Sequence, residues 1–187
     1  MTVYIVTGHA RCGSSMVMRC LEMGGMKATY NRALDEMLRE QPVPREYDPN
    51  PYGYFELGED AYERMPDEMD LYEGLLIKML IPKPLWLTAG PEYEVAFIQR
   101  DPAEIAASQN LAYKKSMTAE SIGRVVDHMH GILSMRRDVK LHRINHRDMI
   151  ERPGETLSRL AQDWPFDPAK AIEGVDKDLY RVRAKGQ

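Results

Sequence analysis

The sequence predicts an α/β fold: a mainly parallel sheet with helices on both faces, formed as a single domain by residues 1–187. Strand-like and helix-like segments alternate along the chain, which is typical of parallel strands joined by helical connections. The 187 residues, 43% of them hydrophobic, are enough for one hydrophobic core. We find no internal repeat or low-complexity segment that would divide the chain.

The first elements are a strand, a turn and a helix. Residues 3–6 are apolar and mostly β-branched, and the run ends at Gly8, as a buried parallel strand would. A turn rich in glycine and serine follows. The next residues, 15–23, have the length and composition of a helix, which the glycines at 24 and 25 end.

The later elements follow the same alternation. The helix that begins at Pro102 has Asp101 as its candidate N-cap. Proline-rich stretches at 42–51 and 81–84 interrupt the alternation as loops. We expect further strands at 75–81, 94–99 and 139–144, and further helices at 31–40, 58–65, 102–113, 119–136 and 154–163.

Charge is distributed unevenly along the chain. The formal net charge is −4, but residues 41–73 alone hold ten acidic and two basic side chains. The sequence therefore lacks the continuous basic stretch that nucleic-acid binding would need, and we expect no nucleic-acid partner.

Localisation is predicted from what the sequence lacks. Its longest uncharged stretches reach about ten residues, against about 20 for a membrane-spanning helix. No basic region precedes the first apolar run, so we expect no signal peptide. The two cysteines are too few for a disulfide framework. We therefore expect a cytoplasmic protein with no membrane span.

Residues 8–15, Gly-His-Ala-Arg-Cys-Gly-Ser-Ser, stand between a strand and a helix, which is the setting of a phosphate-binding loop. A nucleotide triphosphatase has lysine where this chain has Ser14, and it uses that lysine together with Mg²⁺. Here the basic residue is Arg11, and Ser14 and Ser15 supply hydroxyl groups. A sulfuryl group carries less charge than a terminal phosphoryl group, so these groups could bind it without a metal. The alternative is a tight turn that binds no anion.

The cysteines and histidines do not show the spacing of a phosphatase loop or of a metal site. A phosphatase loop needs five residues between Cys12 and its arginine, whereas Arg19 leaves six, so Cys12 is interpreted as a small loop residue. His142 and His146 are interpreted as strand and loop residues. No group of histidines, cysteines and carboxylates has metal-ligand spacing, and we expect no metal site.

Two motifs carry a resemblance to a known family. Residues 7–16 resemble the Pro-Arg-Ser-Gly-Thr-Ser loop of the sulfotransferases that use 3′-phosphoadenosine 5′-phosphosulfate (PAPS), although Ala10, Cys12 and Ser14 differ from it. Residues 95–108 resemble that family's 3′-phosphate motif, in which a strand ends in arginine and a serine follows eight residues later. Residues 50–56 and 144–153 resemble segments of bacterial members.

The resemblance implies a P-loop sulfotransferase fold, a small bacterial-type member and PAPS as cosubstrate, with adenosine 3′,5′-bisphosphate as product. Arg100 and Ser108 would bind the 3′-phosphate, although either residue alone would more readily be interpreted as structural. A basic C-terminal segment with Arg181 and Arg183 would close over the same phosphate, unless it is only a frayed terminus. The loop residues that would bind the 5′-phosphosulfate are Arg11, Cys12, Gly13, Ser14 and Ser15.

Three residues are candidates for the chemistry. Glu56 ends a matched segment and is the candidate general base, with a plain surface carboxylate as the alternative. Lys78 stands where related enzymes place a catalytic lysine; Leu80 stands where the cytosolic branch has a histidine, which favours a carboxylate base. His9 lies inside the loop and is a second candidate base. Lys83 is a weaker candidate for the same positive charge as Lys78.

These expectations add up to an enzyme that transfers a sulfuryl group in line, from PAPS to a hydroxyl or amine. The acceptor would be an unidentified small molecule, glycan or lipid with a free hydroxyl. Residues 41–73 form an acidic insertion on the acceptor side, which we expect to disfavour anionic acceptors. The alternatives are a small-molecule or nucleoside kinase with a divergent loop, and a nucleotide-binding protein without catalysis. The oligomeric state is not readable from the sequence.

Overall fold

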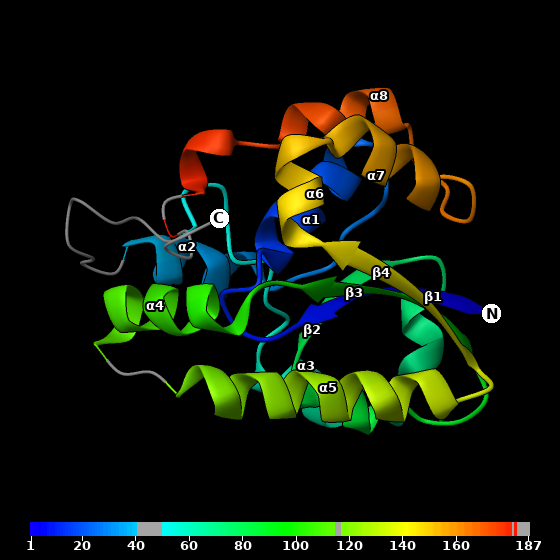
Figure 1. Cartoon of the computed structure of the whole chain (residues 1–187). Helices are drawn as coiled ribbons and strands as arrows, with labels where there is room; N and C mark the ends of the chain where they lie inside the picture. The colour runs from blue at the N-terminus through cyan, green and yellow to red at the C-terminus, as the bar shows by residue number, and fades with distance from the viewer. Residues whose placement is uncertain (41–49, 115–116, 181, 183–187) are drawn as a thin grey trace.

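The computed structural model describes residues 1–40, 50–114, 117–180 and 182. Its centre is a four-stranded sheet in the order β2-β1-β3-β4, with every neighbouring pair parallel. In the register, Val6 of β1 lies between Lys78 of β2 and Ala96 of β3. The α/β fold class predicted from the sequence is confirmed (Figure 1). The strands are β1 (Thr2–Gly8), β2 (Leu76–Leu80), β3 (Glu92–Gln99) and β4 (Val139–Asn145).

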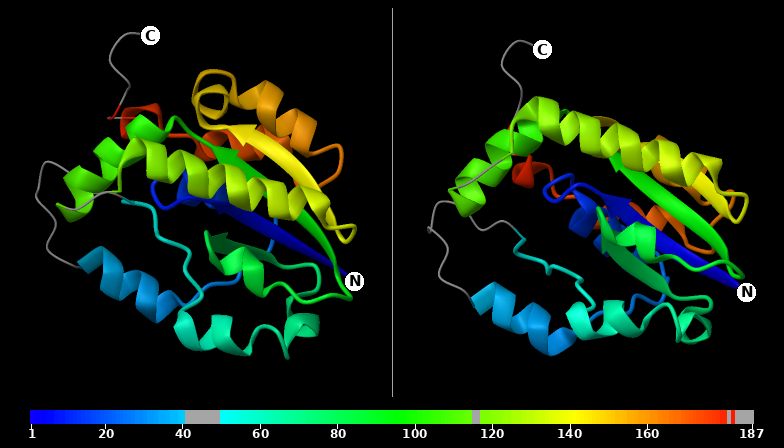
Figure 2. Two further views of the ribbon diagram at one scale, coloured as in Figure 1. Left: turned by 60° about the horizontal axis from the view of Figure 1, so that its bottom comes forward. Right: turned by 90° about the horizontal axis from the view of Figure 1, so that it is seen from below.

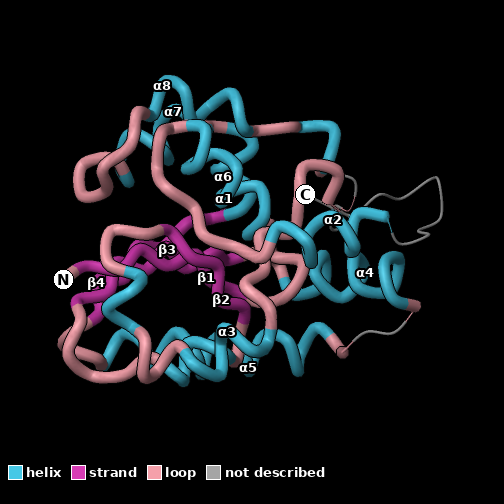
Figure 3. The backbone as a smooth tube through the Cα atoms, turned by 180° about the vertical axis from the view of Figure 1, so that it is seen from behind, coloured by secondary structure: helices cyan, strands magenta, loops and turns pink. Residues whose placement is uncertain are grey.

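Helices cover both faces of the sheet, because alternate strand residues are apolar on each face. Val6 and Ala96 pack in one core, under α1 (Ser14–Met23), α6 (His146–Glu151), α7 (Pro153–Leu160) and α8 (Pro168–Ala171). Ile5 and Phe97 pack in the other, against α3 (Glu59–Arg64) and α5 (Ala119–Met135). The views from below and from behind show the sheet between these two layers (Figures 2 and 3).

Two helices lie beyond the carboxyl end of the sheet, α2 (Arg32–Glu40) and α4 (Pro102–Tyr113) (Figure 1). The predicted cap of α4 is present, since the Asp101 side chain accepts from the backbone N–H of Ala103 at 2.7 Å. Ligands of parallel α/β sheets bind at this end. In the part of the chain that is described, no helix is both long and apolar enough to span a bilayer.

Two helices were missing from the sequence prediction, α6 and α8. Residues 146–151 were expected to be loop, but they form α6. The Asn145 side chain caps it by accepting from the N–H groups of Arg147 and Asp148, at 2.9 and 3.2 Å, and Met149 and Ile150 are buried beneath it. The interpretation of His146 as a loop residue was therefore wrong.

Candidate active site

The loop that joins β1 to α1, from Gly8 to Gly13, contains three residues with positive φ angles, and two of them are glycines. Gly8 has φ 152°, and a Cβ there would lie 2.6 Å from the Cys12 sulfur and 2.9 Å from the Ile98 carbonyl oxygen. Gly13, the N-cap of α1, has φ 100°. Arg11 also has a positive φ, 74°, which a non-glycine residue seldom adopts. The loop thus reaches α1 with the first N–H groups of the helix at the carboxyl edge of the sheet, where they favour an anion.

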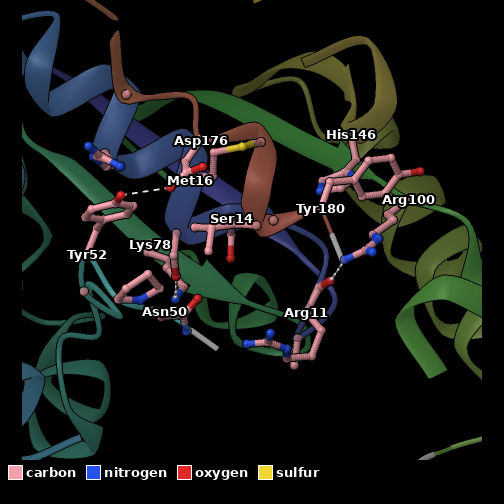
Figure 4. A pocket seen from close by; sticks show the side chains of 18 of the residues that line it. Arg11, Ser14, Met16, Asn50, Tyr52, Lys78, Arg100, His146, Asp176 and Tyr180 are labelled. Atoms are coloured by element: carbon pink, nitrogen blue, oxygen red, sulfur yellow. Dashed lines mark hydrogen bonds between the residues drawn. The ribbon is translucent and has the colours of Figure 1, made fainter. Parts of the chain in front are cut away.

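The loop touches the second predicted motif directly. Arg11 Nε donates to Ser108 Oγ at 3.2 Å, and Arg100 Nη1 donates to the Arg11 carbonyl oxygen at 3.0 Å. Ser108 is buried inside α4, two turns after Arg100. Because β1 and β3 are neighbours, residues some 90 positions apart meet at one edge (Figure 4).

Arg100 is held by groups on several sides. Its Nε donates to the carboxylate of Glu104 at 3.0 Å, and Glu104 is 3% exposed. Tyr180 Oη donates to the same carboxylate at 2.9 Å, and Arg100 Nη2 donates to the Val182 carbonyl oxygen at 2.8 Å. Each terminal nitrogen of a guanidinium carries two hydrogens. Nη1 and Nη2 of Arg100 can therefore each donate a second hydrogen bond, to an anion, while they bond to the two carbonyl oxygens. Arg181 and Arg183 lie outside the described residues.

Lys78 and Glu56, two of the predicted catalytic residues, form an ion pair. Lys78 Nζ lies 2.8 Å from Glu56 Oε1 and donates to Ser15 Oγ at 3.2 Å. It also donates to the carbonyl oxygen of Tyr54. Lys78 is 2% exposed, whereas the Glu56 side chain keeps 20% of its surface exposed. A buried ammonium and an accessible carboxylate therefore sit together at the first turn of α1.

Asp35 of α2 brings Glu56 to this place. Its buried carboxylate accepts from the N–H groups of Tyr54 and Phe55, at 2.6 and 2.8 Å. Phe55 has φ 58°, and the Glu56 carbonyl oxygen accepts from the N–H of Asn31 at 2.8 Å. Residues 50–56 are thereby drawn in beside α1.

A pocket of about 840 Å³, measured out to its open mouth, is lined by residues of both motifs, among them Arg11, Ser15 and Arg100. Its charged lining consists of the cations Arg11, Arg19, Lys78 and Arg100 and the carboxylate of Asp176. Figure 4 shows Arg100, His146 and Tyr180 along one side and Tyr52 and Asp176 along the other. Uncharged residues of the lining include Gly13, Ser14, Ser15, Met16, Ile150 and Leu179.

Five sequence candidates are not among the pocket's lining residues: His9, Cys12, Glu56, Lys83 and Ser108. His9 is 8% exposed, and its Nδ1 lies 3.3 Å from Gln109 Nε2. Cys12 is fully buried, and burial raises the pKa of its thiol. Lys83 pairs with the exposed Glu59 at 2.9 Å.

His146 is a pocket residue that the sequence reasoning missed. A Cβ on Gly13 would lie 2.5 Å from His146 Cδ2, so the imidazole packs directly against the loop. Burial lowers the pKa of His146 to about 3, and the charge of Arg100 acts in the same direction. The capping pattern of Asn145 could have indicated a helix here, but not a ring buried beside Gly13.

The C-terminal segment 174–180 also contributes to the pocket wall, which the sequence did not predict. Gly174, Asp176, Leu179 and Tyr180 line the pocket. Within the described ranges, no three histidine, cysteine or carboxylate side chains are placed so as to hold a metal ion.

Comparisons with known proteins give the fold. No family model and no curated protein matches the chain. A solved sulfotransferase domain from the curacin biosynthetic pathway has a TM-score of 0.52 at 15% identity, over 95% of this chain and 79% of that one. An unliganded sugar kinase from Janibacter sp. HTCC2649 has a TM-score of 0.48 at 12% identity, over 89% of this chain and 96% of that one. The chain therefore has a P-loop-type α/β fold, similar in architecture to a sulfotransferase domain.

Proposed function

We propose that the protein is a sulfotransferase that moves the sulfuryl group of PAPS to a hydroxyl or amine without a metal. The observation that carries the proposal is the contact of Arg11 with both Ser108 and Arg100. It unites a loop suited to a 5′-phosphosulfate with an arginine and a serine suited to a 3′-phosphate. PAPS carries anions at both of these positions.

The lining of the pocket supports this donor. Ser14 supplies a hydroxyl group where a triphosphate-binding loop would supply its lysine, and Ser15 adds a second hydroxyl. Met16 and Leu179 line the same pocket and give an apolar surface on which a base can pack. Arg100 presents a planar guanidinium, whose geometry suits a phosphate.

In the proposed reaction, the acceptor oxygen or nitrogen attacks sulfur from the side opposite the nucleotide. The new bond to sulfur forms as the bond from sulfur to the 5′-phosphate oxygen breaks, and adenosine 3′,5′-bisphosphate leaves with that electron pair. Glu56 takes the acceptor's proton through its exposed side. Lys78, beside Ser15, stabilises the negative charge that develops on the leaving oxygen.

Calorimetry without Mg²⁺ tests the donor. We expect adenosine 3′,5′-bisphosphate to bind at least tenfold more tightly than adenosine 5′-phosphate, since a phosphate held by arginine contributes about 1.5–3 kcal/mol. Absence of binding at millimolar bisphosphate would refute the proposal. Turnover of ATP that depends on Mg²⁺ would favour a kinase instead.

The variant for this test must keep the fold. Arg100→Gln alone would leave the buried Glu104 without its cation, so we pair it with Glu104→Gln. The double variant should bind the bisphosphate no more tightly than the monophosphate. Arg152→Gln is the control, because Arg152 pairs with Asp148 on the surface and does not line the pocket.

A further inference from the structure

The carboxylate of Asp176 differs in charge from the other charged residues that line the pocket. Among the described lining residues it is the one carboxylate, whereas four are cations, of which Arg19 lies on its side of the pocket, over the Tyr52 ring. It lies close to Met16, on the side of the pocket away from Arg100 (Figure 4). An anion would be repelled here, so this part of the pocket suits a different portion of the donor.

Two hydrogen bonds fix the orientation of Asp176. Its Oδ2 accepts from Tyr52 Oη at 2.8 Å, and its Oδ1 accepts from the N–H of Asp178 at 2.9 Å, capping the 3₁₀ helix Lys177–Leu179. The Tyr52 ring in turn lies 3.4 Å from the guanidinium carbon of Arg19. Three distant parts of the chain thus hold one carboxylate in the pocket wall.

A carboxylate only accepts hydrogen bonds, and each of its oxygens has about two lone pairs. Both oxygens of Asp176 therefore keep acceptor capacity beyond the bonds to Tyr52 and Asp178. A ligand group that binds Asp176 must donate a hydrogen bond, and the neighbouring Met16 and Leu179 offer an apolar surface to the portion that carries it. An exocyclic amine on an aromatic base meets both conditions.

We propose that Asp176 selects the base of the donor nucleotide by accepting a hydrogen bond from the exocyclic amine of adenine, with Tyr52 as its positioning residue. This inference rests on the proposed function. Hypoxanthine carries a carbonyl oxygen in place of that amine. The carbonyl oxygen and the Asp176 carboxylate would then face each other as two acceptors with no hydrogen between them, which is unfavourable.

Calorimetry with adenosine and inosine 3′,5′-bisphosphates isolates this contact, because the two ligands share their ribose and phosphates. The wild type should prefer the adenosine ligand about tenfold or more. Asp176→Asn keeps the helix cap, since asparagine caps as well as aspartate, and its amide can donate to the hypoxanthine carbonyl. We expect this variant to reduce the preference to about threefold or less, or to reverse it.

Two further variants separate the roles. Tyr52→Phe should give an intermediate preference, since it removes the hydroxyl that orients Asp176 and keeps the ring over Arg19. Asp178→Asn is the matched control on the same 3₁₀ helix, because its side chain does not line the pocket, and it should keep the wild-type preference.

The outcomes distinguish this inference from the function on which it rests. Equal loss of both ligands in Asp176→Asn would overturn it and assign Asp176 to the ribose. Binding of both ligands by the wild type without preference would overturn it alone. Binding of neither would overturn the proposed function, and this inference with it.

Discussion

The Nζ of Lys78 lies 2.8 Å from Oε1 of Glu56, so two residues 22 positions apart form a mostly buried ion pair at the first turn of α1. Lys78→Met would leave the partly buried carboxylate of Glu56 without its cation. We expect it to lower the free energy of unfolding by about 2 kcal/mol, measured by urea denaturation. Glu56→Gln should have a similar effect, and the double variant should lose less than the sum.

The pair Lys83–Glu59, whose carboxylate is exposed, is the control for this experiment. Its nitrogen and oxygen are 2.9 Å apart, but Glu59 is 70% exposed. Glu59→Gln should therefore change the free energy of unfolding by less than about 1 kcal/mol through this pair. Equal effects at Glu56 and Glu59 would contradict the structural importance assigned to the buried pair.

Gly174 should not tolerate a side chain. A Cβ there would lie 2.7 Å from the Cα and 2.9 Å from the N of Cys20, both backbone atoms of α1. Gly174→Ala should push segment 174–180 away from the helix and lower the free energy of unfolding by about 1–3 kcal/mol. It should also weaken nucleotide binding, because Asp176 and Leu179 belong to the displaced wall; denaturation and calorimetry measure the two effects.

Gly131 in α5 is the matched control. No atom lies within 4 Å of a Cβ built there, so Gly131→Ala should raise the free energy of unfolding by about 0.5–1 kcal/mol through helix propensity. A comparable loss of stability in both variants would show that contact with α1 is not the cause.

His146 makes stability depend on pH in a defined window. Burial lowers its pKa from 6.5 in the unfolded chain to about 3 in the folded protein. Between these two pH values the unfolded chain binds a proton at His146 that the native state does not bind. The contribution of His146 to the free energy of unfolding, which is fully present above pH 6.5, is therefore lost on acidification, by about 1.4 kcal/mol per pH unit. His146→Phe removes this dependence.

The measurement is urea denaturation of the wild type and His146→Phe at several pH values from 7.5 to 4.5. The stability of the wild type relative to the variant should fall as the pH drops below 6.5. The exposed His128 provides the control, as His128→Gln should leave the pH profile unchanged. A constant difference between wild type and His146→Phe would contradict the burial of a neutral imidazole.

The two cysteines should be inert in the folded protein. Cys12 and Cys20 are both buried, and burial raises their pKa values, that of Cys20 to about 12. A thiol reagent at pH 8 should therefore modify neither residue under native conditions and both in denaturant. Rapid modification of Cys12 in the native protein would show that the loop opens.

The sequence predicted β1 and β3 because each contains a continuous apolar run, which leads to Gly8 in β1 and to Arg100 after β3. The family resemblance implied that Arg100 and Ser108 bind one phosphate, because both belong to one motif of a strand end and the helix that follows. The contact of Ser108 with Arg11 depends on β1 and β3 being neighbours, and sheet order is a long-range property that local patterns do not contain.

Other parts of the site could not be predicted from local sequence patterns, because they also depend on contacts between distant residues. The pairing of Glu56 with Lys78 requires the buried hydrogen bonds from Tyr54 and Phe55 to Asp35, a residue that the sequence did not single out. The burial of His146 arises where α6 meets the loop at Gly13. The roles assigned to His9, Arg181 and Arg183 stay predictions.

The backbone of Arg11 has an evolutionary consequence. At φ 74° a glycine would be the more stable residue, by about 1 kcal/mol. The chain instead keeps a long cationic side chain there and accepts a conformation that its neighbours must enforce. Directed evolution for thermostability alone should therefore tend to replace Arg11 with glycine, and a screen that also requires nucleotide binding should retain the arginine.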